Sequence, residues 1–465
     1  MVDLPLVAYP YQELDIQNLV AKNGTGIVAT QVGGGKTLIA IETAKRLELQ
    51  TVFVIAPKGT HKRAWEKTII RQIPNAEVRY INSSKSGQEA YISLKSGNAG
   101  WYLISPEFFR TMSWAAFRKV ELAVFDEVHR ASNRKSRTAT ALRTLKAERR
   151  IGLSGTIAGN KIEGIWSVLK WIYPTVAGDS FWAWVDKYCT TKFDPFAGKV
   201  VAGERVAGSI VKDIPCYIRH LKRDHCCNLH PEGMDAELPR VQYEERVVQL
   251  SAEQKKIYKK MERDLVVWLE GNPLVAEVPV ATRIRLRQIT LGVPSIDEAG
   301  VVHFADDCKS SKLDEMFQII SDLPDGEPLL ILTHSQKFAQ ITTQRLQAKG
   351  ISAYEWSGRK SQQDRDKALE DFIGGRVKAI VAVISAIGEG TDGLQEVCST
   401  VIWLSRDDNR MLNEQAAGRL DRQGQKSSVL SFDIIAEDTY DEGQLSKLVR
   451  DQLAMNSSLR LQRGE

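Results

Sequence analysis

The sequence predicts an α/β protein with two units, each a parallel β-sheet covered by helices on both faces, and a mostly helical stretch between them. Three observations support this fold class. Short apolar segments recur between helical patterns, they form two series separated by a helical middle region, and each is followed by a loop of polar or small residues. A strand that is apolar on both faces is typical of a parallel sheet covered on both sides.

The two series give the expected strands of the two units. In the first series they cover residues 26–29, 51–56, 101–104, 122–125 and 150–153. In the second series they cover residues 328–332, 351–354, 379–383, 400–404 and 429–434. We therefore expect an α/β unit over residues 1–160, a helical insertion and linker over 161–311, and a second α/β unit over 312–465.

The composition sets limits on the class of protein. The chain has 465 residues, 43% hydrophobic and 26% charged, which suits two or three packed domains. Its net charge of +5, from 63 basic and 58 acidic residues, is too even to identify a nucleic-acid-binding protein by itself. The six cysteines are sparse, and no run approaches the ~18 apolar residues needed to span a bilayer. We expect a soluble cytoplasmic protein without a signal peptide or membrane segment.

A glycine-rich loop follows the first expected strand. The segment Thr30-Gln31-Val32-Gly33-Gly34-Gly35-Lys36-Thr37 stands between this strand and a helical run, which is the context that a phosphate-binding loop needs. The glycines Gly33, Gly34 and Gly35 let backbone N–H groups point toward phosphate oxygens. Lys36 can reach the β- and γ-phosphates of ATP, and the Thr37 hydroxyl can hold Mg²⁺. Thr30 stands where the general pattern has glycine, so a turn that binds no phosphate is the alternative.

An acidic pair ends another expected strand. Residues 122–125 run directly into Asp126 and Glu127. An aspartate at the carboxyl end of a buried strand is placed to serve Mg²⁺, and the adjacent glutamate is placed to polarise an attacking water as a general base. The alternative is a solvated helix N-cap, because acidic residues favour that position.

Two arginines stand late in the second unit. Arg419 and Arg422 are three residues apart, so on a helix they would share a face and could meet a γ-phosphate together. Arginine suits this task because it is always charged and carries forked donors. An ordinary charged surface helix is the alternative.

Further segments stand in a fixed order around these three. In the first unit they are Tyr9-Pro10-Tyr11-Gln12, Ala56-Pro57-Lys58 with Trp65, Asp126-Glu127-Val128-His129 followed by Ser132, Asn133 and Ser136, and Leu153-Ser154-Gly155-Thr156 with Asn160. In the second unit they are residues 331–336, Ser357-Gly358 with Arg365 and Phe372, residues 385–394, and residues 415–425. Leu238-Pro239, residues 248–251, Gln254 and Tyr258 stand between them. This ordered set resembles the motifs of superfamily-two helicases, specifically the SWI/SNF-type DNA translocase family with a DEAH-like box, over nearly the whole chain.

The resemblance implies two RecA-like P-loop lobes with ATP and Mg²⁺ in the cleft between them, so that lobe closure brings the arginines to the phosphate and drives movement. It assigns adenine recognition to Tyr11 and Gln12, and further ATP contacts to Gly390 and Asp392. It assigns catalysis to Lys36, Asp126, Glu127, Arg419 and Arg422. It assigns coupling to Ser154, Gly155, Thr156 and Gln415, and contacts with nucleic-acid phosphates to Pro57, Lys58, Thr333, Ser335 and Ser385. Ile157 and Glu389 depart from the family pattern.

Three other features have competing interpretations. Cysteines and histidines gather between residues 216 and 230, where a zinc site competes with an ordinary helical segment, which we favour because no Cys-x₂-Cys pair occurs. The aromatic residues between 166 and 188 are spaced for packing of amphipathic helices, although aromatics can also stack on bases. Arg283, Arg285 and Arg287 suit either a solvated helix face or a brace that contacts phosphates.

The expected activity is ATP hydrolysis coupled to movement on, or remodelling of, duplex or branched DNA without sequence preference, by a monomer. The DNA transactions could be repair or replication. The alternatives are a strand-separating DNA or RNA helicase, the motor subunit of a restriction or repair complex, and an ATP-gated switch that binds a protein partner.

Overall fold

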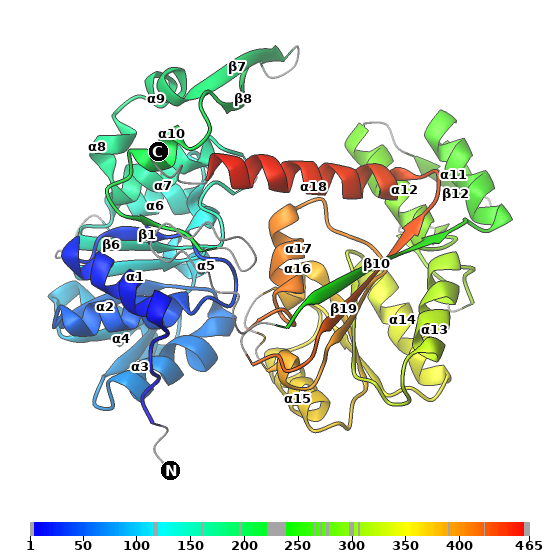
Figure 1. The fold of residues 1–465 in the computed structure, drawn as a ribbon, viewed down its shortest axis with the longest axis horizontal. Coiled ribbons are helices and arrows are strands. Elements are labelled where there is room, and N and C mark those ends of the chain that lie inside the picture. Colours follow the sequence, from blue (N-terminus) through cyan, green and yellow to red (C-terminus); the bar gives the residue numbers. More distant parts are fainter. Residues whose placement is uncertain are drawn as a thin grey trace. The chain divides into compact units, whose positions relative to one another are not determined.

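The structure is a computed structural model of the chain and forms two compact units. The residues described are 4–114, 120–159, 161–194, 198–220, 239–264, 266–269, 272–275, 279–296, 302–305, 307–388, 391, 393–422 and 424–459. The first unit comprises Met1–Glu237 together with Leu453–Glu465, and the second comprises Leu238–Gln452. Each unit contains one large parallel sheet between two layers of helices (Figure 1).

The sheet of the first unit has the strand order β3-β4-β2-β5-β6-β1-β9, and every pairing in it is parallel. Its strands are β1 (Gly26–Val28), β2 (Thr51–Ile55), β3 (Val78–Ile81), β4 (Gly100–Ile104), β5 (Val120–Asp126), β6 (Ala147–Leu153) and β9 (Tyr217–Ile218). Its helices are α1 (Pro10–Ala21), α2 (Lys36–Arg46), α3 (Lys67–Gln72), α4 (Lys85–Ser96), α5 (Pro106–Phe109), α6 (Arg137–Thr144), α7 (Gly164–Ile172), α8 (Pro174–Ala177), α9 (Phe181–Tyr188) and α10 (Ser209–Lys212). A hairpin of β7 (Cys189–Asp194) and β8 (Gly198–Glu204) follows α9.

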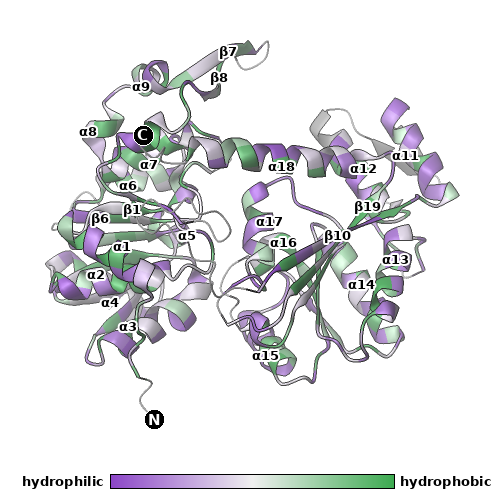
Figure 2. Ribbon diagram, in the orientation of Figure 1, coloured by the Kyte–Doolittle hydropathy of each residue, from purple (hydrophilic) through white to green (hydrophobic). Residues whose placement is uncertain are grey.

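Alternate residues of each strand build two cores on opposite faces of this sheet, because successive side chains of a strand point to opposite sides. One core combines residues such as Val52 and Val54 with α1, α2 and α3. The other combines residues such as Phe53 and Ile55 with α4, α6, α7 and α9. Both faces are therefore covered, which explains why central strands such as β2 are buried at every position. Helices such as α2 and α4 carry hydrophilic and hydrophobic residues together (Figure 2), as expected of helices with one face on a sheet.

The sheet of the second unit has the order β10-β19-β18-β15-β17-β16 and is also parallel throughout. Its strands are β10 (Val241–Val248), β15 (Leu329–Thr333), β16 (Ala353–Trp356), β17 (Ala379–Val383), β18 (Thr400–Trp403) and β19 (Val429–Ala436). Its helices are α11 (Ala252–Asp264), α12 (Pro279–Leu291), α13 (Ser311–Asp322), α14 (Gln336–Ala348), α15 (Gln362–Ile373), α16 (Ile384–Ile387) and α17 (Arg410–Ala417), and α18 (Tyr440–Ser458) leads back to the first unit. Two short hairpins complete it, β11 (Val266–Leu269) with β12 (Asn272–Val275) and β13 (Ser295–Ile296) with β14 (Val302–His303).

The predicted fold class is confirmed, and each expected strand overlaps a strand of the structure. The units differ from the three segments that the sequence suggested, because residues 161–311 do not stand apart. Their first part, including the aromatic residues Trp166 and Trp184, packs into the core of the first unit. Their last part, with α11 and α12, packs into a core of the second unit.

The residues after Leu453 return to the first unit. Leu459 is fully buried in the core that α7 and α9 share. Its backbone carbonyl accepts a hydrogen bond from the Tyr217 hydroxyl at 3.2 Å, and the Asn456 side chain accepts one from Arg219 at 2.8 Å. The strand β9 therefore pairs with β1, and side chains in and next to it bond to Leu459 and Asn456 near the end of the described chain.

A buried lysine ties the first turn of α13 to the sheet of the second unit. Lys312 is 1% exposed, donates to the carbonyls of Leu404 and Ile434 at 2.8 Å each, and lies 2.5 Å from a carboxylate oxygen of Asp441. Replacing it with methionine leaves the Asp441 carboxylate buried without this cation. Lys312→Met should therefore lower the free energy of unfolding by about 3–5 kcal/mol.

Thermal or urea-induced unfolding of the second unit measures this effect. The matched control is Lys309→Met, because the Lys309 side chain is 71% exposed and its pairing with Glu253 is at the surface. The control should change the free energy of unfolding by less than about 1 kcal/mol. Equal effects of the two substitutions would contradict the prediction.

Candidate active site

The predicted phosphate-binding loop, acidic pair and serine-glycine-threonine segment meet at one edge of the first sheet. They follow the carboxyl ends of β1, β5 and β6, which are neighbours in the order β5-β6-β1. The backbone N–H of Ser154 donates to the Val28 carbonyl at 3.0 Å, which joins the ends of β6 and β1. In open parallel sheets, ligands bind beyond the carboxyl ends of the strands.

Two glycines of the loop have backbone angles that other residues rarely adopt. Gly33 and Gly35 have φ angles of 89° and 70°, in the left-handed region where glycine is unstrained. Lys36 begins α2, and its ammonium group donates to the carbonyls of Thr30 at 2.8 Å and Gln31 at 3.3 Å. The lysine thus lies across its own loop. Thr37 is partly exposed in the first turn of the same helix.

The residues expected to recognise adenine lie against this loop. The Tyr11 hydroxyl and the Gln12 side-chain amide each donate to the Gly34 carbonyl at 3.3 Å. A Cβ atom on Gly35 would lie 2.1 Å from the Gln12 amide nitrogen, so another side chain here would displace the Gln12 amide from the loop. Together with its left-handed φ angle, this contact favours glycine next to Lys36 in the loop.

The acidic pair lies at the carboxyl end of β5, where Asp126 is the last residue of the strand and Glu127 follows it. The Asp126 carboxylate accepts a hydrogen bond from the indole N–H of Trp65 at 3.1 Å. Burial raises the pKa of Asp126 above its ordinary value, and the neighbouring charge of Glu127 raises it further, while Trp65 and Lys36 act in the opposite direction. Lys36 lowers the pKa of both carboxyl groups, consistent with the loop and the acidic pair lying at the same edge of the sheet.

Glu127 has an unusual backbone conformation, and its pKa is shifted in the opposite direction to that of Asp126. Its φ angle of 59° is left-handed, which is strained for a residue other than glycine and is common at functional sites. Burial raises the pKa of Glu127, but the hydrogen bond with His129 and the interactions with Lys36 and Arg130 outweigh it and hold the pKa below its ordinary value. Glu127 is therefore ionised at neutral pH, as a general base must be.

A short chain of contacts joins the acidic pair to the segment after β6. His129 Nδ1 lies 3.2 Å from a carboxylate oxygen of Glu127 and 2.9 Å from the Ser154 hydroxyl oxygen. The Ser154 hydroxyl in turn donates to the Thr156 carbonyl at 2.6 Å. Gly155 lies beside the phosphate-binding loop, because a Cβ on it would be 4.0 Å from Val32. Ser154, one of the residues predicted to couple hydrolysis to movement, is therefore joined to the predicted base through His129.

The oxygen atoms of Asp126 and Thr37 are of the kind that a magnesium ion binds. Mg²⁺ prefers oxygen ligands and takes one or two of them from the protein, with phosphates and water supplying the rest. The carboxylate lies within the electrostatic influence of Lys36, the residue beside Thr37. Within the described part of the chain, no group of three or more His, Cys, Asp or Glu residues could hold a metal ion.

In the second unit, Arg419 and Arg422 do not share a helix. The helix α17 ends at Ala417, and the two arginines lie in the turns that follow. The helical spacing argument was therefore wrong. The guanidinium of Arg419 donates to the carbonyls of Thr391 and Gly388, so it holds the segment after α16. Arg422 is partly exposed.

Gln415 also contacts the segment after α16. Its side-chain oxygen would lie 3.0 Å from a Cβ atom on Gly388, and Gln415 itself is 9% exposed. This packing joins two segments that the sequence singled out separately. Gly390 and Asp392, the other predicted ATP contacts, lie outside the described residues, as does Asn160.

The predicted nucleic-acid contacts differ in their accessibility. Lys58 and Ser385 are exposed, whereas Pro57 is buried. Thr333 is fully buried, and its hydroxyl oxygen lies 3.2 Å from that of Ser405. The Ser335 hydroxyl accepts from the Phe338 N–H and caps α14. Lys58 and Ser385 are thus the two members of this set whose side chains can reach a ligand without rearrangement.

The cysteine and histidine cluster is only partly described. Cys216 and His220 flank β9, so the helical interpretation was wrong for this part, and residues 225–230 lie outside the described residues. His220 Nε2 lies 2.7 Å from the Asp15 carboxylate, and its ring meets Tyr11 edge-on at 5.3 Å between centroids. This fully buried pair was not predictable from the sequence, because a strand of two residues leaves no periodic pattern.

Arg287 is an internal residue of the second unit. It is 7% exposed, and its guanidinium donates to the Asp408 carboxylate at 3.0 Å and to the Arg406 carbonyl at 2.7 Å. It supports the loop after β18. The aromatic residues Trp166, Trp171, Trp184 and Tyr188 are buried in the first unit's core, which confirms the packing interpretation for them.

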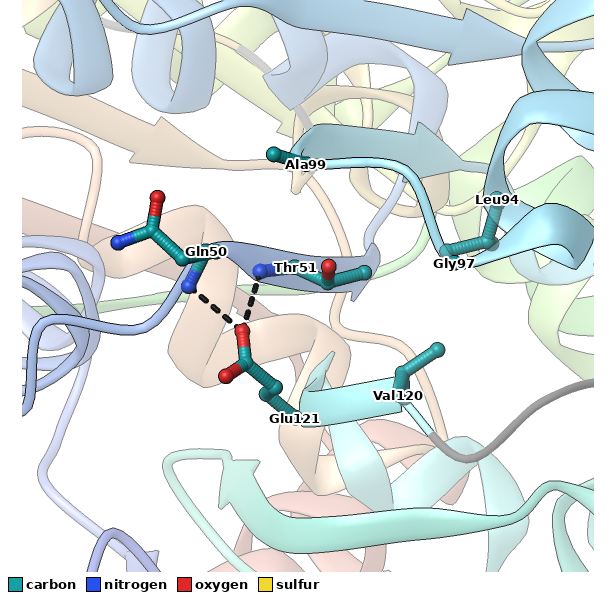
Figure 3. A pocket seen from close by; sticks show the side chains of 7 residues that line it. All are labelled: Gln50, Thr51, Leu94, Gly97, Ala99, Val120 and Glu121. Atoms are coloured by element: carbon teal, nitrogen blue, oxygen red, sulfur yellow. Dashed lines mark hydrogen bonds between the residues drawn. The ribbon is translucent and has the colours of Figure 1, made fainter.

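A surface depression of about 360 Å³ lies at the opposite edge of the first sheet. It is lined by residues that include Thr51 and Val120, the first residues of β2 and β5 (Figure 3). A carboxylate oxygen of Glu121 accepts the backbone N–H groups of Gln50 and Thr51 at 2.6 and 2.7 Å. Because it lies at the amino ends of the strands, this depression is separate from the candidate active site.

Comparisons with known proteins identify the family. The sequence profile of the SNF2-related domain matches residues 16–290, and that of the helicase conserved C-terminal domain matches residues 309–424. Relatives include the human SWI/SNF-related matrix-associated actin-dependent regulator of chromatin subfamily A member 1, 24% identical over 94% of this chain and 42% of its own length. Another is the ISWI chromatin-remodeling complex ATPase ISW1 of Saccharomyces cerevisiae, 24% identical over 97% of this chain and 40% of its own length.

A solved structure also resembles the chain. The Sulfolobus solfataricus SWI2/SNF2 ATPase core in complex with dsDNA is 20% identical, covers 99% of this chain and 98% of its own, and has a TM-score of 0.44.

The chain spans less than half the length of the two relatives named above. No helix among the described residues is long and apolar enough to cross a membrane. The SNF2-related profile alone matches more than half of the chain, and the helicase C-terminal profile matches a segment after it. The chain therefore belongs to the SNF2-related family.

Proposed function

We propose that this chain is an ATPase motor that moves on or remodels duplex DNA without sequence preference, using Mg²⁺ and acting as a monomer in the cytoplasm. The observation that carries the proposal is the meeting of Lys36, Asp126 and Glu127 at the carboxyl edge of one sheet. Family membership supports the same activity. The four described cysteines are buried free thiols, which suits a reducing compartment.

The proposed roles follow from the contacts. Lys36 would exchange the carbonyls of Thr30 and Gln31 for phosphate oxygens, because an ammonium group pairs better with a phosphate than with neutral carbonyls. Tyr11 and Gln12, which lie on the loop, would recognise adenine. Mg²⁺, held by Thr37 and Asp126, would neutralise charge on the phosphates.

Glu127 would orient the attacking water and accept its proton, since its carboxylate is ionised and its backbone is held in a left-handed conformation. His129 and Ser154 would relay changes at this carboxylate to the segment after β6. Arg419 and Arg422 would stabilise charge on the transferring phosphoryl group. These arginines belong to the second unit, so hydrolysis would require residues of both units.

Lys58 and Ser385 are the best placed residues for DNA phosphates, because both are exposed. Contacts to phosphates carry little sequence information, which is why the proposed binding is nonspecific.

The proposal predicts that DNA stimulates ATP hydrolysis and that salt suppresses the stimulation. The test compares the ATPase rate of the full chain with duplex, forked and single-stranded DNA and with RNA. Duplex or forked DNA should raise the rate at least about tenfold, and the DNA affinity should fall at least about tenfold between 50 and 200 mM salt as counterions compete. A rate that is indifferent to every nucleic acid would refute the motor.

A displacement assay distinguishes translocation from strand separation. Removal of a third strand from a triplex without unwinding of a duplex supports the translocase. Unwinding of a duplex supports a strand-separating helicase instead.

A further inference from the structure

The segment between β2 and α3 has an unusual backbone that ends at a tryptophan. It begins with a 3₁₀ turn over Lys58–Thr60 and continues as a π-helix over His61–Glu66. A π-turn holds an extra residue per turn, which changes the direction of the side chains that follow, and such turns are frequent at functional sites. The ring of His61 fixes the start of this turn through a 2.8 Å contact with the Ala56 carbonyl.

The side chain that this turn directs is Trp65. It is fully buried among apolar residues such as Val54, Ala56 and Ile69. Its indole N–H is the only polar atom of that side chain, and it donates to Asp126 across 61 positions of sequence. A phenylalanine would fill most of the same volume without this donor. The use of tryptophan here is thus explained by the carboxylate and not by packing alone.

We infer that Trp65 is a positioning residue that holds the Asp126 carboxylate in the orientation that binds Mg²⁺, and so links the exposed Lys58 segment to the metal site. The inference rests on the proposed function for the identity of the metal ligand. Groups that hydrogen-bond to a ligating side chain fix its orientation and change metal affinity by about 10- to 100-fold. The eight residues from Lys58 to Trp65 form one continuous helical segment, so a shift of Lys58 moves the indole.

The test is nucleotide binding by the full chain without DNA and without turnover, with a fluorescent ADP analogue as the probe. Affinity is measured in EDTA and over a Mg²⁺ titration for the wild type and Trp65→Phe. The matched control is Trp101→Phe, because Trp101 is 5% exposed in the same core and its strand β4 lies away from Asp126 in the sheet order. Trp65→Phe should leave the affinity in EDTA unchanged and raise the half-saturating Mg²⁺ concentration about tenfold or more. The control should change neither quantity.

A double-mutant cycle separates positioning from general damage. In an Asp126→Asn background, Trp65→Phe should cause no additional change in Mg²⁺ dependence, because the positioned carboxylate is already absent. An additive effect, or a Mg²⁺ dependence of Trp65→Phe equal to that of the wild type, would overturn the inference. These outcomes do not depend on DNA. A failure of the motor proposal, seen in the DNA-stimulated ATPase assay, can therefore be distinguished from a failure of the inference about Trp65.

A second measurement decides the matter if Trp65→Phe does not fold. The chain has ten tryptophans, and each gives one indole N–H resonance. One of these resonances should shift when Mg²⁺ is added to the ADP-bound wild type, and the same one should differ in Asp126→Asn. If no indole resonance responds to both changes, the inference is wrong.

Discussion

Replacing Glu127 with glutamine should reduce DNA-stimulated ATP turnover by about 10²- to 10⁴-fold and leave nucleotide binding intact. The substitution keeps the size of the side chain and the hydrogen-bonding partner His129 but removes the negative charge. A glutamine cannot accept a proton from water at any pH of interest. The low pKa of Glu127 indicates that the wild-type group is a carboxylate at neutral pH, so the substitution removes a group that is already in the form of a base.

The strand β5 provides its own control for this prediction. Glu121 lies on the same strand near its amino end, where its carboxylate accepts two backbone N–H groups. The Glu121→Gln change is chemically identical, and the amide oxygen can still accept. It should leave turnover near the wild-type rate. Steady-state ATPase assays and binding of a fluorescent ADP analogue measure both quantities. If Glu127→Gln turned over ATP at a rate close to that of Glu121→Gln, Glu127 would not be the base.

Lys36→Ala should also abolish turnover, but by a different route. It removes the cation expected to hold the phosphates, so nucleotide affinity should fall together with the rate. The folded state should persist, because Lys36 is only partly buried and donates to the Thr30 and Gln31 carbonyls of its own loop. Loss of binding in Lys36→Ala beside retained binding in Glu127→Gln would separate the two roles.

Arg422→Ala should reduce the rate of ATP hydrolysis about 10³-fold or more, with little change in nucleotide affinity or thermal stability. An arginine that meets the transferring phosphoryl group stabilises charge that develops only in the transition state, so its loss affects the rate and not the binding. The expectation for Arg419→Ala is different. Arg419 also holds the carbonyls of Thr391 and Gly388, so its loss should lower thermal stability as well as the rate.

Single-turnover hydrolysis and thermal unfolding distinguish these effects. Arg376→Ala is the matched control in the same unit, because the Arg376 side chain is 68% exposed and pairs with Asp371 at the surface. It should alter neither the rate nor the stability appreciably. Retention of near-normal single-turnover hydrolysis by Arg422→Ala would remove that residue from the proposed catalytic set.

The central strands were predictable from the sequence because they are buried on both faces. Strands such as β2 and β17 read as continuous apolar runs and lie inside their sheets. The strands that escaped prediction lie at sheet edges. β3 is mostly half-buried, and β10 carries exposed polar residues along most of its length, so neither gives an apolar run.

The site was predictable in its order but not in its contacts. The phosphate-binding loop and the acidic pair are local patterns, and parallel topology alone brings their strand ends to one edge. The contact of Trp65 with Asp126 depends on a π-turn that no simple periodicity reveals. The sequence did not show that α17 ends before Arg419. The residues beyond Ala417 form tight turns with hydrogen bonds over three or four residues, as in a helix.

The return of the chain to the first unit has a consequence for biosynthesis. Residues 238–452 are inserted, in the topological sense, into a unit whose core includes Leu459. Domains form in the order in which the ribosome releases them, so a nascent chain would complete the second unit while the first still lacked the partner of Tyr217. The apolar site that Leu459 fills would stay open until that residue emerged. A message truncated within α18 would therefore yield a folded second unit attached to an unfinished first one, a substrate for chaperones and proteases.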